Sequence, residues 1–105
     1  MGQSERVSTP THATLATFRM DPAREAEQRE GLHRMIVPNV RQAPGFVSGC
    51  WTRNRETNES LALVTFSSRE HAESFAENVR SNAANQAAVG IEILSMAIVE
   101  VSASA

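Results

Sequence analysis

The most restrictive feature of the sequence is a pair of apolar segments that offer no polar face to water. Residues 60–66 read SLALVTF, and residues 91–101 read IEILSMAIVEV. Successive side chains of a β-strand point to opposite faces of the sheet, so as strands both segments have two apolar faces. In the first, these faces are Leu61 with Leu63, and Ala62 with Val64 and Phe66. In the second, they are Ile91, Ile93, Ala97 and Val99, against Leu94, Met96 and Ile98. Both faces of the sheet therefore need cover.

Breaks in the hydrophobic pattern divide the chain into elements in the order β-α-β-β-α-β. Asp21 and Pro22 open the first helix, because Asp is a good N-cap and Pro fits the first helical position. Pro44 and Gly45 end this helix. The four predicted strands are residues 12–20, 46–53, 60–66 and 91–101. A polar hairpin loop at 53–59 joins the second strand to the third. This order is that of the ferredoxin-like α+β fold.

The two predicted helices differ in how they begin and in how regular they are. The apolar stripe of the first consists of Leu32, Met35, Ile36, Val40 and Ala43. Because Pro38 lacks an N–H, we expect this helix to bend or break about one turn before its end. The second helix is predicted to begin with a capping box in which Ser67 caps and Glu70 follows three residues later. Residues 82–90 are predicted to be a connection of small residues.

The length of 105 residues suits one domain with one core. We assign the domain to residues 12–101, with a disordered tail at 1–11 and frayed residues at 102–105. Two helices can cover only one face of a four-stranded sheet, so the other apolar face needs a partner. The simplest partner is a second copy of the chain, which predicts a two-fold homodimer with its sheets face to face. The alternative is a monomer with an exposed apolar sheet.

Composition and charge argue against several kinds of partner. The net charge of −2 and the pI of about 5.9 come without any block of like charges, so we predict no nucleic acid and no membrane partner. Cys50 is the only cysteine, and the histidines His12, His33 and His71 are too scattered for metal-ligand spacing. The first residues hold no apolar signal region, and no apolar run approaches about 20 residues. We therefore expect a soluble cytoplasmic protein without a metal site.

Two passages of the sequence resemble a known family. The passage VPNVRQAPGFVSGCW runs from a helix end through a Pro-Gly-Phe corner into a strand, and VTFSSREHAESFAENV is a strand followed by a helix. Over residues 12–101, these passages and the element order are similar to antibiotic-biosynthesis-monooxygenase-like proteins of the dimeric α/β-barrel superfamily. The resemblance implies a homodimer with a pocket between the sheet and the two helices of each subunit. It also implies oxidation of a flat phenolic or polycyclic molecule by O₂ without a metal, flavin or other cofactor.

The same superfamily leaves two other functions open. Some members bind and degrade haem through an Asn, a Trp and a His. The chain has Asn39, Trp51 and His71, but these residues do not match that motif position by position. The main alternative to a cofactor-independent monooxygenase is therefore a non-catalytic binding or interaction module of the same fold. Haem binding is the third hypothesis.

Four residues are candidates for a site, and each also has a structural explanation. Trp51 is either a pocket wall for a flat aromatic ligand or a packing residue of the core or dimer interface. Asn39 falls within the apolar stripe, where its partner is a ligand or a backbone group freed by Pro38. His33 is either a proton-transfer group or a solvated residue at the edge of the stripe. Arg19 either binds a substrate carboxylate or phenolate, or pairs with a nearby Glu.

Three neighbours of Trp51 receive no functional role. Cys50 points to the opposite face of a regular strand, and nothing in the sequence indicates an activated thiol. Arg53 and Arg55 lie at the predicted hairpin, where we expect them to be solvated.

Overall fold

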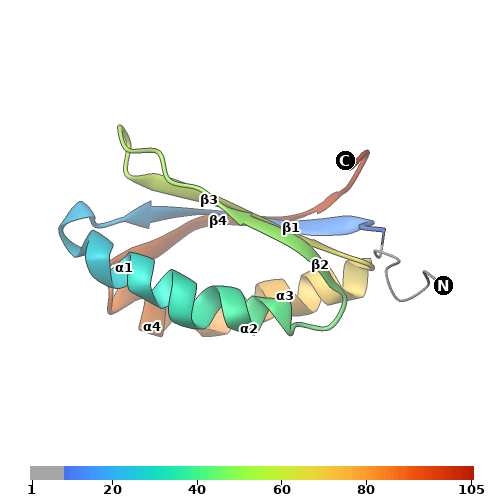
Figure 1. Ribbon diagram of the computed structural model, residues 1–105, viewed down its shortest axis with the longest axis horizontal. Helices are drawn as coiled ribbons and strands as arrows, with labels where there is room; N and C mark the ends of the chain where they lie inside the picture. Colours follow the sequence, from blue (N-terminus) through green and yellow to red (C-terminus); the bar gives the residue numbers. More distant parts are fainter. Residues whose placement is uncertain (1–8) are drawn as a thin grey trace.

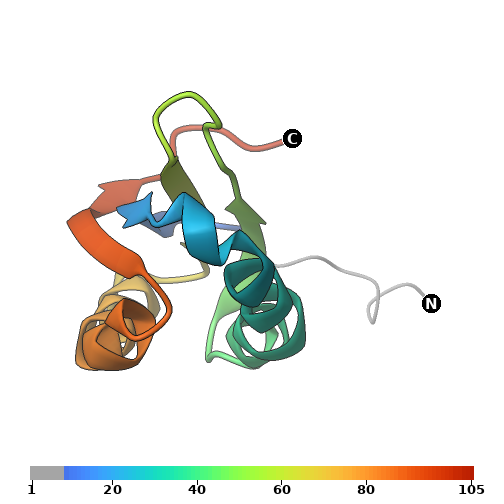
Figure 2. The ribbon, with the colours of Figure 1, turned by 90° about the vertical axis from the view of Figure 1, so that its left-hand side faces the viewer.

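The computed structural model describes residues 9–105, which form one antiparallel sheet with all helices on one of its faces (Figures 1 and 2). The sheet order is β2-β3-β1-β4, as the ferredoxin-like prediction requires. The strands are β1 (His12–Met20), β2 (Phe46–Trp51), β3 (Glu59–Phe66) and β4 (Ile91–Glu100). The helices are η2 (Pro22–Arg24), α1 (Glu25–Gly31), η3 (Leu32–Ile36), α2 (Val37–Arg41), α3 (Arg69–Ser81) and α4 (Ala83–Ala87).

The two faces of β3 are the two predicted from its alternation. Val64 and Phe66 are buried under the helices, and Ala62 lies with them. Leu61 and Leu63 lie on the opposite face, where they remain 42% and 37% exposed. We call this opposite face the open face, because no described helix covers it (Figure 1).

The predicted faces of β4 are wrong in their grouping, because the strand contains a β-bulge. The register against β1 shifts by one residue, so Leu94 has no direct partner in β1. One extra residue in a strand moves every side chain after it to the opposite face of the sheet from the one that simple alternation predicts. The residues that pair with helix-facing positions of β1 are Ile91, Ile93, Met96 and Ile98. Ala97 and Val99 consequently lie on the open face and not with Ile91 and Ile93.

The first helical segment is not broken at Pro38, since helical structure continues to Arg41, but the type of helix changes just before the proline. Residues Leu32–Ile36 form a π-helical turn, in which the Val37 N–H donates to the Leu32 carbonyl, and α2 then begins around Pro38. The π-helical turn contains one residue more than an α-helical turn and lies directly before Pro38. Because Pro38 has no N–H, it would interrupt the hydrogen bonds of a regular α-helix at this point. The π-helical turn also changes which side chains face the sheet. Met35 was predicted to be part of the apolar stripe, but it is 63% exposed and does not pack against the sheet.

The second helical segment begins one residue later than predicted. Ser68, and not Ser67, is the N-cap of α3, and its Oγ accepts from the His71 N–H at 3.2 Å. The Ser67 N–H is already used, because it donates to the Gly45 carbonyl at 2.9 Å. The expected capping box with Glu70 is therefore not formed. The predicted connection at 82–90 also contains the short helix α4.

Small side chains let α3 lie directly on the sheet. Ala72 and Ala76 are buried, and the Thr14 hydroxyl donates to the Ala72 carbonyl at 2.8 Å. The ring of Phe75 lies 5.2 Å from that of Phe66, in tilted geometry. Backbone approach of this kind fixes the helix on β1 by both packing and a buried hydrogen bond.

The ends of the domain are tied to the sheet. The Thr11 N–H donates to the Phe66 carbonyl, and the Thr11 carbonyl accepts from the Val101 N–H, both at 2.9 Å. Most of the predicted disordered tail, residues 1–8, lies outside the described residues. Residues 102–105 are exposed and have no regular secondary structure. None of the described helices has the length and apolar character needed to cross a membrane.

Two glycines provide a matched test of the corner between α2 and β2. Gly45 has a φ of +78°, and an added Cβ would lie 2.2 Å from the His71 ring. We expect Gly45→Ala to lower the free energy of unfolding by at least about 1–2 kcal/mol, from the left-handed backbone alone. Gly31 lies in α1, with nothing within 4 Å of an added Cβ. Gly31→Ala should raise the free energy of unfolding by about 0.5–1 kcal/mol. Urea unfolding measures both, and equal effects would contradict the assigned corner.

Candidate functional site

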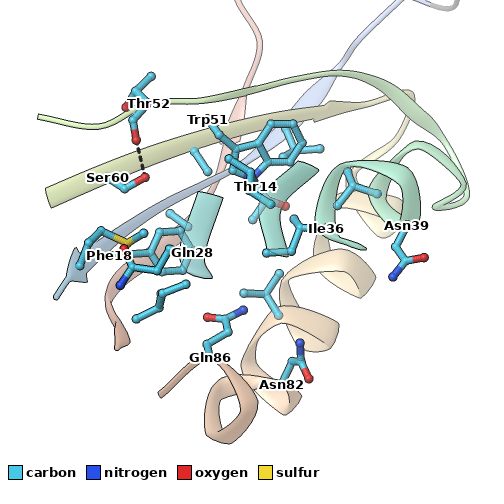
Figure 3. A pocket seen from close by; sticks show the side chains of 18 of the residues that line it. Thr14, Phe18, Gln28, Ile36, Asn39, Trp51, Thr52, Ser60, Asn82 and Gln86 are labelled. Carbon is cyan, nitrogen blue, oxygen red and sulfur yellow. Dashed lines mark hydrogen bonds between the residues drawn. The ribbon is translucent and has the colours of Figure 1, made fainter. Parts of the chain in front are cut away.

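A cavity of about 480 Å³ lies between the helix-covered face of the sheet and the two helical segments (Figure 3). Small side chains form its floor, namely Thr14, Ala16, Ser60 and Ala62. Its opposite walls come from α1–α2, through Leu32, Ile36 and Val40, and from α3–α4, through Phe75, Val79 and Gln86. The volume falls within the range of small-molecule sites, and half of the lining side chains are apolar.

Trp51 forms one wall of the cavity. It pairs with Ala62 in the β2–β3 register and therefore shares the helix-covered face. A Cβ on Gly49 would lie 2.8 Å from the edge of the indole ring, so the ring lies over this glycine. Cys50, between them, is exposed and pairs with Leu63 on the open face. Gly49 thus leaves the space in which the indole can lie along the strand and face the cavity.

One carboxylate lines the cavity, and two arginines neutralise it. Glu25 accepts from Arg55 at 3.0 and 2.7 Å, and from Arg29 at 2.8 Å. The hydrogen bonds from Arg55 lower the pKa of Glu25 to about 2, although partial removal from water acts in the opposite direction. The charges of Arg53 and Arg29 lower it further. Glu25 is therefore ionised at neutral pH and is a poor proton acceptor.

A buried amide holds a second guanidinium at the same end of the cavity. Gln28 is only 4% exposed, and its Nε2 donates to the carbonyls of Asp21 at 3.0 Å and Val89 at 2.9 Å. Its Oε1 accepts from Arg53 Nη1 at 3.1 Å. The Nε and Nη2 atoms of Arg53 are shielded from solvent and have no hydrogen-bond partner among residues 9–105. This arginine was expected to be solvated, and that prediction is wrong.

Gln86 supplies an acceptor from the opposite wall. Its Oε1 is shielded from solvent and likewise has no partner within the described chain. The hydroxyl of Ser60, by contrast, is satisfied, because it donates to the Thr52 carbonyl at 2.5 Å (Figure 3). Gln86 and Arg53 both belong to the cavity lining, and they hold one buried acceptor and two buried donors without a partner in residues 9–105. A ligand would reach these atoms once the side chains that cover them move. Buried polar atoms of this kind normally have a partner.

Three of the four candidate residues line the cavity, and the fourth does not. Trp51, His33 and Asn39 all contribute to its lining. His33 and Asn39 are exposed, so they lie at the rim of the cavity. Because its amide is exposed to water, Asn39 does not require the ligand or the freed backbone group that the sequence suggested as its partner. Arg19 pairs with Glu92 at 3.1 Å in an exposed ion pair away from this cavity. The structural explanation given for Arg19 is thus the one observed.

The sequence interpretation missed Arg53, Arg55, Gln28 and Gln86. Strand alternation could have indicated the position of Arg53, because a residue two places after Trp51 in a strand lies on the same face. The strand pairing does continue past Trp51, through a bridge between Asn54 and Glu59. The contact between Gln28 and Arg53 joins residues 25 positions apart and has no local signal.

The cavity lining contains neither a metal-ligand cluster nor the histidine named in the haem hypothesis, as far as the described residues show. Residues 9–105 contain no cluster of three His, Cys, Asp or Glu side chains able to hold a metal ion. His71, the histidine of the haem hypothesis, is not part of the cavity lining, and its ring lies against Gly45.

The fold and the cavity define a ferredoxin-like α+β protein with an aromatic-walled site on the helix side of its sheet. The structure is similar to that of a monooxygenase from the gene ActVA-Orf6 of Streptomyces coelicolor, determined in complex with the ligand nanaomycin D. The TM-score is 0.64 at 16% sequence identity, over 91% of this chain and 89% of that chain. This likeness confirms the expected fold. No family model and no curated protein matches the sequence.

The ion pairs of Glu25 predict how stability depends on pH. A carboxylate with a folded pKa of about 2, against an ordinary value of 4.5, stabilises the fold fully above the ordinary value. This contribution is lost as the pH falls from about 4.5 through about 2. We expect Glu25→Gln to destabilise the protein at about pH 6, with the difference from wild type shrinking toward about pH 2.5.

Urea unfolding at several pH values measures this difference. Glu77→Gln is the control, because Glu77 is exposed and forms no ion pair with any described residue. A Glu25→Gln effect that stays constant over this pH range would contradict the assigned ion pairs.

Proposed function

We propose that the cavity binds a flat hydroxylated aromatic molecule and that the protein is a cofactor-independent monooxygenase. The observation that carries this proposal is the shape and chemistry of the cavity: an indole wall, a mainly apolar lining surface and, in the lining residue Gln86, a buried acceptor without a partner among residues 9–105. A phenolic hydroxyl is the group that this acceptor would bind. The fold likeness to a monooxygenase determined with nanaomycin D supports the same class of reaction.

The aromatic ring system of the ligand would pack against Trp51. The indole lies over Gly49 and presents its surface to the cavity. Offset stacking of aromatic rings adds about 0.5–1.5 kcal/mol to the burial of their area. Ile36 and Val40 line the cavity from the α1–α2 side and would help to exclude water from the ligand. Such a site would orient the substrate and remove its water shell.

The proposed reaction converts a ring CH₂ group of an anthrone-type substrate into a carbonyl. One O₂ is consumed for each substrate molecule: one oxygen atom enters the product, and the other leaves as water with the two hydrogens of the CH₂. The substrate supplies all four electrons. The protein's task is to remove a proton and to stabilise the resulting enolate or phenolate, and charge stabilisation in a dry site is effective for this purpose.

His33 is our candidate for the proton acceptor. Glu25 is the only carboxylate in the cavity lining, and its lowered pKa makes it a poor base. Among the described residues, His33 is the only histidine of the lining, and histidine is the side chain that most often transfers protons in enzyme sites. Asn39, also at the rim, would donate a hydrogen bond from its amide to the developing oxyanion.

A non-catalytic binding module is the second candidate function. The observation in its favour is the position of His33 and Asn39, which are exposed at the rim and lack a buried orienting partner. Catalytic groups usually have rotamers fixed by packing and by further hydrogen bonds. A module of this kind would bind the same aromatic ligand through Trp51 and Gln86 without consuming oxygen.

Oxygen uptake and calorimetric binding, measured with a hydroxylated anthrone and with metals chelated, separate the two functions. The monooxygenase predicts protein-dependent uptake of one O₂ per product. Trp51→Ala should weaken binding by about tenfold or more. His33→Gln should lower turnover by about 100-fold but leave binding intact. Cys50→Ala, on the open face, is the control and should change neither. Binding without uptake in the wild type would favour the module, and no binding would exclude both proposals.

We also propose that the open face pairs with a second copy of the chain, as the two-sided strands predict. Leu61, Leu63 and Leu94 are among the most exposed large apolar side chains of the described residues. A second sheet would remove these leucines from water, at about 25 cal/mol for each Å² of apolar surface buried.

Sedimentation equilibrium tests this dimer. Leu63→Glu should convert a dimer into a monomer at micromolar concentration, because a charge would be buried at the centre of the contact. Met35→Glu is the matched control, since Met35 is also exposed but lies on the helical side of the molecule. A wild-type protein that sediments as a monomer would contradict the proposal.

A further inference from the structure

We infer that the ligand of the cavity carries a carboxylate, and that the Nε/Nη2 edge of Arg53 binds it. This inference rests on the proposed aromatic ligand and specifies its polar end. It starts from the two donors of Arg53 that are shielded from solvent and have no partner in residues 9–105.

The geometry leaves one edge of the guanidinium free. Arg53 Nη1 is held by Gln28 Oε1 at 3.1 Å. Gln28 is itself fixed by its two hydrogen bonds to the carbonyls of Asp21 and Val89. The remaining Nε–H and Nη2–H lie along the same edge of the planar group, where they are parallel. Parallel donors on one edge match the two coplanar oxygens of a carboxylate.

Charge favours an anion at this end of the cavity. The charged lining residues here are three arginines, Arg29, Arg53 and Arg55, and one carboxylate, Glu25. Glu25 is already bound by Arg55 and Arg29. Arg53 has no carboxylate partner in the described part of the chain. A guanidinium cannot lose its proton in a protein, so its charge persists. Glu25 is near enough for Arg53 to lower its pKa, but its oxygens are bound by Arg55 and Arg29, which leaves Arg53 free to pair with an anionic ligand.

Burial makes the carboxylate preferable to neutral groups. Shielded donors that lack partners are costly, and the cost is greater when the group is charged. A hydroxyl or a ketone offers one acceptor atom and leaves the charge uncompensated. A carboxylate engages both donors and neutralises the charge, and a charge-assisted pair of this kind is about twice as strong as a neutral hydrogen bond.

The position of Arg53 also gives the ligand a direction. Figure 3 shows Gln28 at one end of the site and Asn39 at the other, with Trp51 between them in this view. A carboxylate held at the Gln28 end would leave the aromatic rings beside Trp51. The opposite edge of the ring system would then lie nearest the rim residue Asn39.

A pair of ligands with the same rings tests the inference. Anthracene-2-carboxylate and anthracene-2-carboxamide differ in charge but hardly in shape. Quenching of Trp51, the only tryptophan, reports the binding of both. We expect the wild-type protein to bind the carboxylate about tenfold or more tightly than the carboxamide.

Variants of Arg53 test whether the preference for the carboxylate ligand comes from the Nε/Nη2 edge of this residue. Arg53→Gln should reduce the preference to about threefold or less. Arg53→Lys keeps the charge but loses the two parallel donors, so its preference should be intermediate. Arg34→Gln removes the same charge from an exposed residue outside the cavity lining and should leave the preference unchanged.

The outcomes separate this inference from the proposed function. Equal affinity of the wild type for both ligands would overturn the carboxylate anchor and leave the aromatic site intact. A preference that survives in Arg53→Gln would also overturn it, because another group would then bind the anion. Failure to bind either ligand would overturn the proposed aromatic site together with its anchor. If circular dichroism shows that Arg53→Gln does not fold, the wild-type comparison and Arg53→Lys decide the question.

Discussion

Side-chain volume on the helix-covered face of the sheet is the constraint on which the rest of the structure depends. At the centre of this face lie Thr14, Ala16 and Ala62, which are too small to fill the space beneath two helical segments. The helix α3 approaches the sheet through Ala72 and Ala76, whereas α1–α2 lies across the cavity. Protein cores are normally close-packed, so small residues on a sheet leave a cavity only where larger side chains around them keep the helices away from the sheet. Here those side chains are aromatic and aliphatic, so the cavity suits an apolar ligand.

The polar end of the cavity depends on one buried amide. Gln28 connects the start of the first helical segment, the turn before β4 and the end of the β2–β3 hairpin through its hydrogen bonds. A buried amide with satisfied donors fixes its neighbours, and here it fixes Arg53. Glu25, one helical turn earlier, holds Arg55 in the same hairpin. The two contacts together hold the hairpin against α1 and set the orientation of the free guanidinium edge.

The sequence predicted the fold more completely than the site, and the reason is physical. Strand alternation and helix caps act over a few residues, so element order and the faces of β3 follow from local patterns. A bulge at Leu94 and the choice between two adjacent serines for the cap at Ser68 depend on the partner strand and on competing hydrogen bonds. The site needs longer-range information still. The sequence singled out Trp51 but not the sheet face on which it lies, and the contact between Gln28 and Arg53 exists only once the chain has folded.

Irregular backbone borders the cavity on two sides, and this agrees with a functional site there. The π-helical turn places His33 at the rim and rotates Met35 into solvent. The β-bulge lies opposite the Thr17–Phe18 step of β1, and Phe18 lines the cavity. Each feature departs from the regular element that local propensity favours, and such departures persist in folded proteins mainly where function requires them. A chain selected only for a stable core would gain from larger side chains on the sheet floor and a regular first helix. The ligand proposed above, which would occupy this space, would account for the absence of both.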